Sequence, residues 1–184
     1  YFEPLLRGTL PKSTGTFSSK DIEHAAHIAF ACNTFYTCGR AVAWFSAVVK
    51  PLKIAPHAFF ADFSEWQQCN NCSKETGFLP EETAQSELEK MQLLFLRYKY
   101  EEKHKEELFL AASDLIRIHG AFSRIAADEE DECIIETSYM PDDILSPAIF
   151  SLERFTDTFT MQPCKIRIFR GNEYPEYKII NESL

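Results

Sequence analysis

The amino-acid sequence changes character once, and this change restricts the folds open to the chain. Residues 19–127 are rich in helix-forming and aromatic residues. Residues 132–180, which follow the acidic run Asp-Glu-Glu-Asp-Glu at 128–132, contain short alternating or β-branched stretches. Helical spacing before the run and strand-like spacing after it predict helices and strands that are segregated along the chain. We therefore expect a predominantly α-helical α+β fold, a bundle-like helical body with a small C-terminal β-hairpin or sheet.

Three helices are expected first. Apolar and small residues recur at the helical spacing through residues 19–36. Residues 40–50 are nearly all apolar and stop at Pro51, which cannot continue a helix. Aromatic residues recur at the same spacing in residues 56–68, where a proline occupies the first turn, so a third helix is predicted there.

The next region permits two interpretations. Neither Gly nor Pro interrupts residues 81–119, which favours a single long helix. The stretch 99–107, however, contains only one apolar residue, so one helical face cannot stay buried throughout. The region is either one helix that extends past the core or an antiparallel pair that breaks near His104.

Strands are expected after the acidic run. Residues 133–139 are rich in β-branched residues, and residues 165–169 alternate between polar and apolar. A Gly-Asn pair at 171–172 before residues 174–180 predicts a hairpin. Between the strands, residues 142–159 are expected to be helical, beginning with two aspartates that suit a helix N-terminus.

A chain of 184 residues suits one domain with one hydrophobic core. Its expected parts are an extended N-terminal arm at 1–18, the helical body at 19–127, and an acidic connector with an α/β segment packed on the body at 128–184. The chain starts at Tyr1 and shows no signal-peptide pattern, so we expect a piece of a larger protein.

Charge and motif content exclude several function classes. There are 28 acidic and 19 basic residues, a net charge of −9, which disfavours a nucleic-acid partner. The longest apolar run, 41–49, is about half of what a membrane span needs, so no span is expected. The six glycines are scattered and no G-x-S-x-G occurs, which argues against nucleotide binding and serine catalysis.

The six cysteines bear on the compartment. An even number, with N-glycosylation sequons at Asn71 and Asn181, would suit a secreted, disulfide-bonded glycoprotein. Cys32, Cys133 and Cys164 instead lie in apolar or strand-like runs, where a free cysteine behaves as a small buried hydrophobe. A core of this size does not need disulfides. We expect an intracellular protein of the cytoplasm or nucleus, with secretion as the alternative.

One segment is a candidate zinc site. Cys69 and Cys72 form a Cys-x2-Cys in a polar loop, the spacing that presents two thiolates to one tetrahedral ion. His57 lies twelve residues upstream, and Cys32 or Cys38 would complete four ligands. The same residues are equally explained as ordinary loop cysteines, so a structural zinc is one of two interpretations.

A metal- or thiol-dependent enzyme of unknown reaction is the alternative function. It would use His24 and His27, which share a helical face at i and i+3, together with Cys69 and Cys72. None of the five histidines has a local catalytic signature. The sequence therefore assigns no catalytic residue.

The aromatic surplus points to binding. With 16 Phe, 7 Tyr and 2 Trp, the chain has more aromatic residues than most cores need. Phe59, Phe60, Phe63 and Trp66 form a stripe that serves either as partner contacts or as core. The leading hypothesis is a protein–protein interaction or scaffolding module of a larger intracellular protein.

Overall fold

The structure, a computed structural model, describes residues 17–180. These residues form seven α-helices and one three-stranded antiparallel sheet. The α-helices are α1 Ser19–Cys32, α2 Phe45–Val49, α3 Pro56–Cys69, α4 Gln85–Glu102, α5 Phe109–Ala126, α6 Pro141–Ile144 and α7 Leu152–Thr158. The strands are β1 Glu132–Thr137, β2 Cys164–Arg170 and β3 Pro175–Ile179. The predicted class, mainly helical α+β with the strands near the C-terminus, is confirmed.

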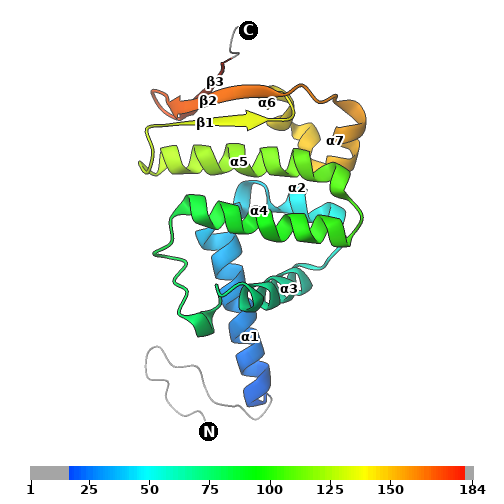
Figure 1. Cartoon of the computed structure of the whole chain (residues 1–184), viewed down its shortest axis with the longest axis vertical. Coiled ribbons are helices and arrows are strands. Elements are labelled where there is room, and N and C mark those ends of the chain that lie inside the picture. Colours follow the sequence, from blue (N-terminus) through cyan, green and yellow to red (C-terminus); the bar gives the residue numbers. More distant parts are fainter. Residues whose placement is uncertain (1–16, 181–184) are drawn as a thin grey trace.

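Short turns of tighter or wider helix join these elements. A π-helix, η1 Asn33–Cys38, continues α1, and 3-10 turns are η2 Ala41–Ala43, η3 Lys50–Leu52, η4 Lys74–Thr76, η5 Glu106–Leu108 and η6 Pro147–Phe150. In Figure 1 the sheet covers α5, α4 and α2 lie on the other side of α5, and α1 and α3 form the opposite end of the molecule. None of the described helices is both long and apolar enough to cross a membrane.

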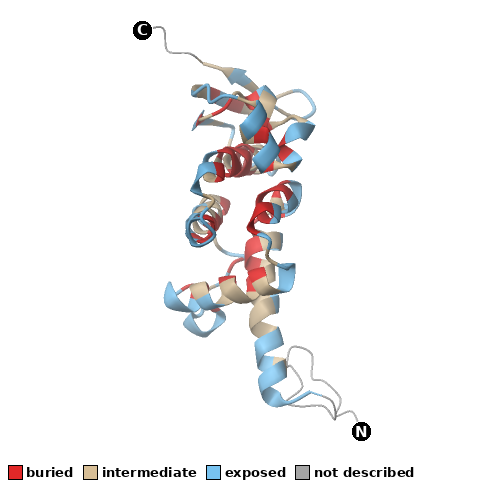
Figure 2. Ribbon diagram, turned by 90° about the vertical axis from the view of Figure 1, so that its right-hand side faces the viewer, coloured by how far each residue is buried: buried red, intermediate tan, exposed pale blue. Residues whose placement is uncertain are grey.

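Helix α1 begins with a reciprocal cap. The Ser18 hydroxyl accepts from the Asp21 amide at 3.3 Å, and the Asp21 carboxylate accepts from the Ser18 amide at 3.0 Å. Its first turns are largely exposed, whereas its C-terminal end enters the core (Figure 2). The predicted helix at 19–36 is thus right at its start but widens into η1. The predicted arm at 1–18 falls almost entirely outside the described residues.

An aromatic cluster forms the core of the helical body. The Phe35 ring of η1 is fully buried, with its centroid 5.1 Å from that of Phe59, 5.0 Å from Phe63 and 6.1 Å from Phe95. Edge-to-face contacts of this kind add to the hydrophobic stabilisation of burial. Helices α3 and α4 therefore pack around η1 as their common centre.

The region 81–119 is an antiparallel pair of helices, as the second interpretation predicts. Helix α4 ends at Glu102, His104 adopts a left-handed conformation with φ 53°, and α5 starts at Phe109. The charged stretch is not wholly solvated, because Lys99 is only 3% exposed and bonds Asp62 at 2.6 Å.

The sheet has the order β1-β2-β3, with every neighbouring pair antiparallel. Ile166 of β2 lies opposite Ile135 of β1 and Ile179 of β3, which sets the apolar face toward α5. The Gly171 amide donates to the Tyr174 carbonyl at 3.1 Å and closes the predicted hairpin. The helix expected at 142–159 is wrong in its middle, since Pro147 lacks an N–H and the chain breaks there into α6, η6 and α7.

Candidate functional site

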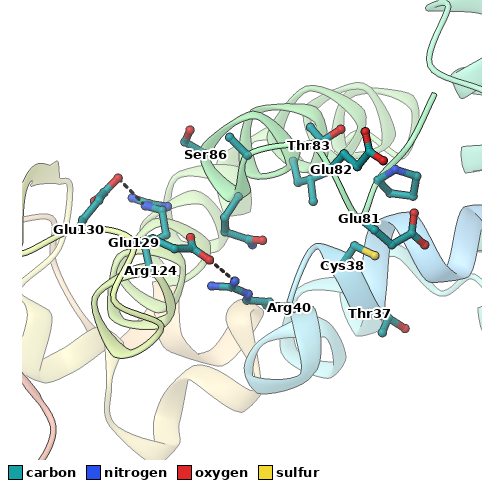
Figure 3. A pocket seen from close by; sticks show the side chains of 14 residues that line it. Thr37, Cys38, Arg40, Glu81, Glu82, Thr83, Ser86, Arg124, Glu129 and Glu130 are labelled. Atoms are coloured by element: carbon teal, nitrogen blue, oxygen red, sulfur yellow. Dashed lines mark hydrogen bonds and ion pairs between the residues drawn. The ribbon is translucent and has the colours of Figure 1, made fainter. Parts of the chain in front are cut away.

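A polar pocket of about 520 Å³ lies where the end of η1, the segment before α4 and the end of α5 meet. Its walls include Cys38 and Arg40 from the η1 side, Glu82 and Gln85 from the α4 side, and Arg124 from α5. In Figure 3 the labelled residues Cys38 and Arg40, Glu82, and Arg124 come from three segments that are distant in sequence.

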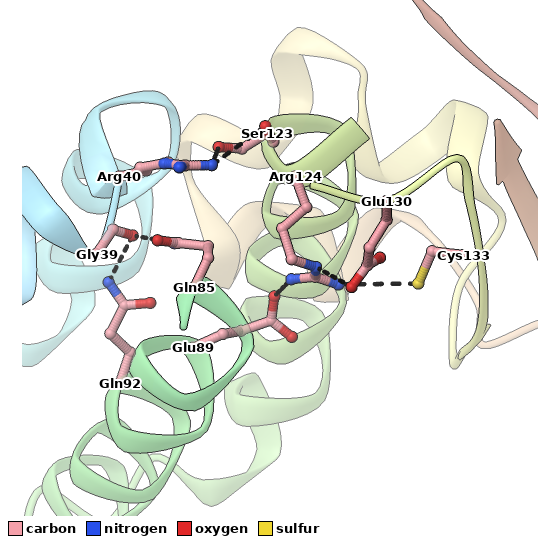
Figure 4. A network of polar contacts seen from close by, with 9 residues as sticks. All are labelled: Gly39, Arg40, Gln85, Glu89, Gln92, Ser123, Arg124, Glu130 and Cys133. Carbon is pink, nitrogen blue, oxygen red and sulfur yellow. Dashed lines mark hydrogen bonds and ion pairs between the residues drawn. The ribbon is translucent and has the colours of Figure 1, made fainter. Parts of the chain in front are cut away.

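The back wall depends on carbonyl groups at the end of η1. Gln92 of α4 donates from Nε2 to the carbonyls of Phe35, at 2.7 Å, and Gly39, at 2.9 Å. Gln85 donates from Nε2 to the same Gly39 carbonyl at 3.1 Å (Figure 4). A Cβ at residue 39 would collide with both the Gln92 amide and the Phe35 carbonyl, so glycine is required for this approach. Helix α4 is thereby fixed to η1.

A buried arginine forms the second wall. Only 8% of the Arg124 side chain is exposed; Nη1 pairs with Glu89 of α4, and Nε bonds Glu130 at 3.1 Å. Its Nη2 also lies 3.7 Å from the Cys133 sulfur in β1. Burial raises the pKa of Glu89, although Arg124 acts in the opposite direction. The guanidinium therefore holds α4, α5 and β1 together.

Arg40 forms the third wall. It has a left-handed backbone with φ 50°, and its Nη1 donates to the Ser123 carbonyl at 3.2 Å and hydroxyl at 3.0 Å. Its Nη2 pairs with Glu129. These bonds fix the turn between η1 and η2 against the end of α5.

Most of the acids in the run 128–132 form ion pairs. Four of its five acids pair with arginines from other elements: Glu129 with Arg40, Glu130 with Arg124, Glu132 with Arg167 and Asp128 with Arg170. The predicted acidic connector lies between the end of α5 and the start of β1, and four of its five charges form ion pairs. The two partners of Arg40 lie 83 and 89 residues away along the chain, so no local pattern signals the contacts of Arg40.

The pocket carries more negative than positive charge. Glu81, Glu82, Glu129 and Glu130 line it against two guanidinium groups, an excess of two carboxylates. The Glu81 carboxylate accepts from Nδ2 of the Asn33 side chain at 2.7 Å. Glu82 is exposed and its side chain has no hydrogen bond or ion pair with any other residue in the described part of the chain. The rim is therefore suited to a cationic group.

The Cys38 thiol in the pocket is not activated as a nucleophile. Burial, followed by the nearby charge of Glu81, raises the pKa of the Cys38 thiol, which keeps it protonated and weakly nucleophilic near neutral pH. No histidine is among the described residues that line the pocket. The arrangement supports binding better than group transfer.

Comparison with known proteins supplies no family. The chain matches no protein-family model, no curated protein and no solved structure.

The structure does not bring the three predicted zinc ligands together. Cys69 is exposed at the end of α3, and Cys72 is buried with its sulfur 3.6 Å from the Gln67 carbonyl. His57 lies in the first turn of the same helix, about 18 Å away along the axis at 1.5 Å per residue. Within residues 17–180, no group of three or more His, Cys, Asp or Glu side chains is arranged to hold a metal ion. Zinc at Cys69 and Cys72 stays a prediction that needs other ligands.

The structure does not join His24 and His27, the histidines of the alternative enzyme hypothesis, to the cysteines. His27 Nε2 lies 2.8 Å from Glu75, which joins α1 to η4, and His24 is exposed on α1. No hydrogen bond joins either histidine to a cysteine in the described residues. All six cysteines are free thiols in the structure.

The predicted partner-binding stripe lies largely inside the molecule. Phe59 and Phe63 are fully buried and Phe60 is 8% exposed. Trp66 is partly buried and stacks on Phe63 with centroids 5.8 Å apart. These rings form core, so they offer little surface for partner contacts. The pocket residues had no sequence signal beyond the acidic run itself.

Proposed function

We propose that this domain is a non-catalytic protein-binding module whose polar pocket accepts a basic segment of a partner protein. The observation that supports it is the excess of carboxylates in a pocket whose two arginines are already held by internal partners. A cation entering the pocket meets the charge of Glu81 and Glu82 without having to displace a guanidinium.

The size and field of the pocket fit this role. A volume of about 520 Å³ accommodates a few side chains rather than a folded surface. A concave site with an excess of one sign of charge favours oppositely charged groups. The chain's net charge of −9 adds a long-range attraction for a basic partner.

We propose an intracellular location as part of the same function. Six free thiols, five of which are at least partly buried, suit the reducing interior of a cell. Alkylation of the denatured, unreduced protein should label all six cysteines. A protein that takes up fewer labels would instead support secretion.

Binding of a short labelled peptide rich in lysine and arginine, followed by fluorescence anisotropy, tests the function. Replacing Glu81 and Glu82 by Gln should weaken binding about tenfold at low salt. Replacing Glu106 and Glu107 of η5 by Gln makes the same charge change at the other end of α4 and should have little effect. Equal loss in both variants, or equal affinity for an acidic peptide, would contradict a site at the pocket.

A further inference from the structure

Strand β3 forms one edge of the sheet, and its backbone direction can be assigned. The Ile180 amide donates to the Lys165 carbonyl at 2.8 Å, and the Gly171 amide donates to the Tyr174 carbonyl at 3.1 Å. In an antiparallel pair, residues alternate between facing the neighbouring strand and facing away from it. Tyr177 and Ile179 therefore direct their N–H and C=O groups away from β2. No other described strand pairs with this edge.

The solvent face of this edge carries a symmetric pattern of side chains. Glu176 and Lys178 share that face because side chains alternate along a strand. Tyr174 and Ile180 flank β3, and their backbone bonds to Gly171 and Lys165 continue the same alternation. Tyr174 is 76% exposed. Glu176 and Lys178 are exposed, and within the described residues the side chain of neither forms a hydrogen bond or ion pair. Two opposite charges thus lie two residues apart on an unpaired edge.

We propose that β3 pairs antiparallel with β3 of a second copy of this chain, about a twofold axis at Tyr177. Residues whose numbers sum to 354 then lie opposite one another, so Glu176 faces Lys178 of the second copy, and Lys178 faces its Glu176. Tyr174 faces Ile180 of the second copy at both ends, an aromatic and β-branched pair that stabilises sheets. The pairing joins two three-stranded sheets into one six-stranded sheet.

The backbone supports the same register. Tyr177 exchanges two N–H···O=C bonds with Tyr177 of the second copy. Each Ile179 amide donates to the Pro175 carbonyl opposite it. Pro175 has no N–H, so each Ile179 carbonyl keeps its bond with water at the rim. The expected ladder has four hydrogen bonds.

Charge selects this register over its neighbours. A slip of two residues in one direction places Glu176 opposite Glu176, and a slip in the other places Lys178 opposite Lys178. Like charges directly opposite one another destabilise a strand pair. A lysine on an edge strand usually discourages pairing, but here the adjacent glutamate makes the edge complementary to itself.

The other edge of the sheet lacks this property. Pairing of β1 with a second β1 about Ile134 would place Glu132 opposite Glu136, which are like charges. Arg117 also donates to the outward carbonyl of Glu136 at 2.7 Å and occupies that edge. Self-pairing is therefore specific to β3.

Sedimentation velocity over a range of concentrations of the complete 184-residue chain tests the proposal. The wild type should show a monomer–dimer equilibrium. Lys178→Glu alone and Glu176→Lys alone should each raise the dissociation constant at least about tenfold. An equimolar mixture of the two variants should restore the dimer, because each glutamate then faces a lysine. Lys20→Glu and Glu65→Lys, exposed charge reversals at the opposite end of the molecule, are the matched controls.

Hydrogen exchange gives a second measurement that needs no variant. The amides of Tyr177 and Ile179 should exchange more slowly as protein concentration rises, whereas those of Ile134 and Glu136 should not change. A wild type that stays monomeric throughout, a dimer that persists in both single variants, or exchange at Tyr177 that is independent of concentration would overturn the proposal. No residue of β3 lines the pocket, so the outcome is independent of the peptide-binding test.

Discussion

Replacement of Asp114 by Asn probes a buried carboxylate that couples stability to pH. Asp114 lies on α5, is 3% exposed, and accepts from the amides of Ser138 at 2.6 Å and Tyr139 at 3.1 Å. It therefore holds the turn after β1 against the helix. Burial raises its pKa from 3.8 to about 6, against the opposing effects of the two amides and of Arg117.

The sign of the effect follows from proton binding. Between the unfolded pKa of 3.8 and the folded pKa of about 6, the folded state holds more protons on Asp114 than the unfolded state does. The free energy of unfolding must then fall as pH rises through that window. A shift of about two pKa units corresponds to about 3 kcal/mol, lost between roughly pH 4 and pH 6.

Urea unfolding followed by tryptophan fluorescence at several pH values measures this contribution. An asparagine side chain cannot ionise, so the free energy of unfolding of Asp114→Asn should lack the fall of about 3 kcal/mol that Asp114 contributes to the wild type. Asp157→Asn, an exposed change on α7, should keep the wild-type pH dependence. Identical pH profiles for Asp114→Asn and the wild type would refute the assignment of a buried carboxylate with a raised pKa.

Three further changes should lower the free energy of unfolding. Phe35→Ala removes the ring at the centre of the aromatic core and should cost about 3–5 kcal/mol. Gly39→Ala adds a Cβ that forces the Gln92 side-chain amide and the Phe35 carbonyl to move, which should cost about 1–3 kcal/mol. Arg124→Ala leaves the largely buried carboxylate of Glu89 without its cation and should cost about 3–5 kcal/mol. Denaturant unfolding at neutral pH measures all three.

Matched controls separate these mechanisms from general sensitivity. Leu94→Ala also removes a large apolar side chain, but Leu94 is 61% exposed and the change should stay within about 0.5 kcal/mol. Arg40→Ala breaks a more exposed ion pair and two hydrogen bonds to Ser123, leaves no buried carboxylate unpaired, and should cost less than Arg124→Ala. An equal loss of unfolding free energy for Arg40→Ala and Arg124→Ala would contradict the argument that burial makes the Arg124–Glu89 pair the costlier one to break.

Helical periodicity predicted the helix at 56–68 but not which segments pack against its apolar face. The spacing of Phe59 and Phe63 identified a helix and its apolar face, yet two interpretations, core or partner contact, remained open. Phe35 and Phe95, from η1 and α4, cover that face in the structure. Which segment covers a face depends on long-range packing, which a single helical period does not contain.

Local composition indicated where a break could lie but left one helix or two open. The loss of apolar residues near His104 indicated that one helical face could not stay buried, and the helix ends there. By contrast, the spacing of His57, Cys69 and Cys72 gives only their separation along the chain, not their distance in space. Because a helix separates His57 from the thiols, sequence proximity did not become spatial proximity.

The acidic composition has two different roles, and only the structure separates them. Glu129 and Glu130 form ion pairs with arginines that hold the fold together. Their charges are therefore largely neutralised and contribute little to the electrostatic field that a partner meets. Glu82 and Glu176 have no cationic partner among the described residues, and each lies beside a surface that can meet another molecule. Net charge counts both kinds equally. Glu82 and Glu176, rather than the total of −9, therefore indicate the two surfaces where binding is to be tested.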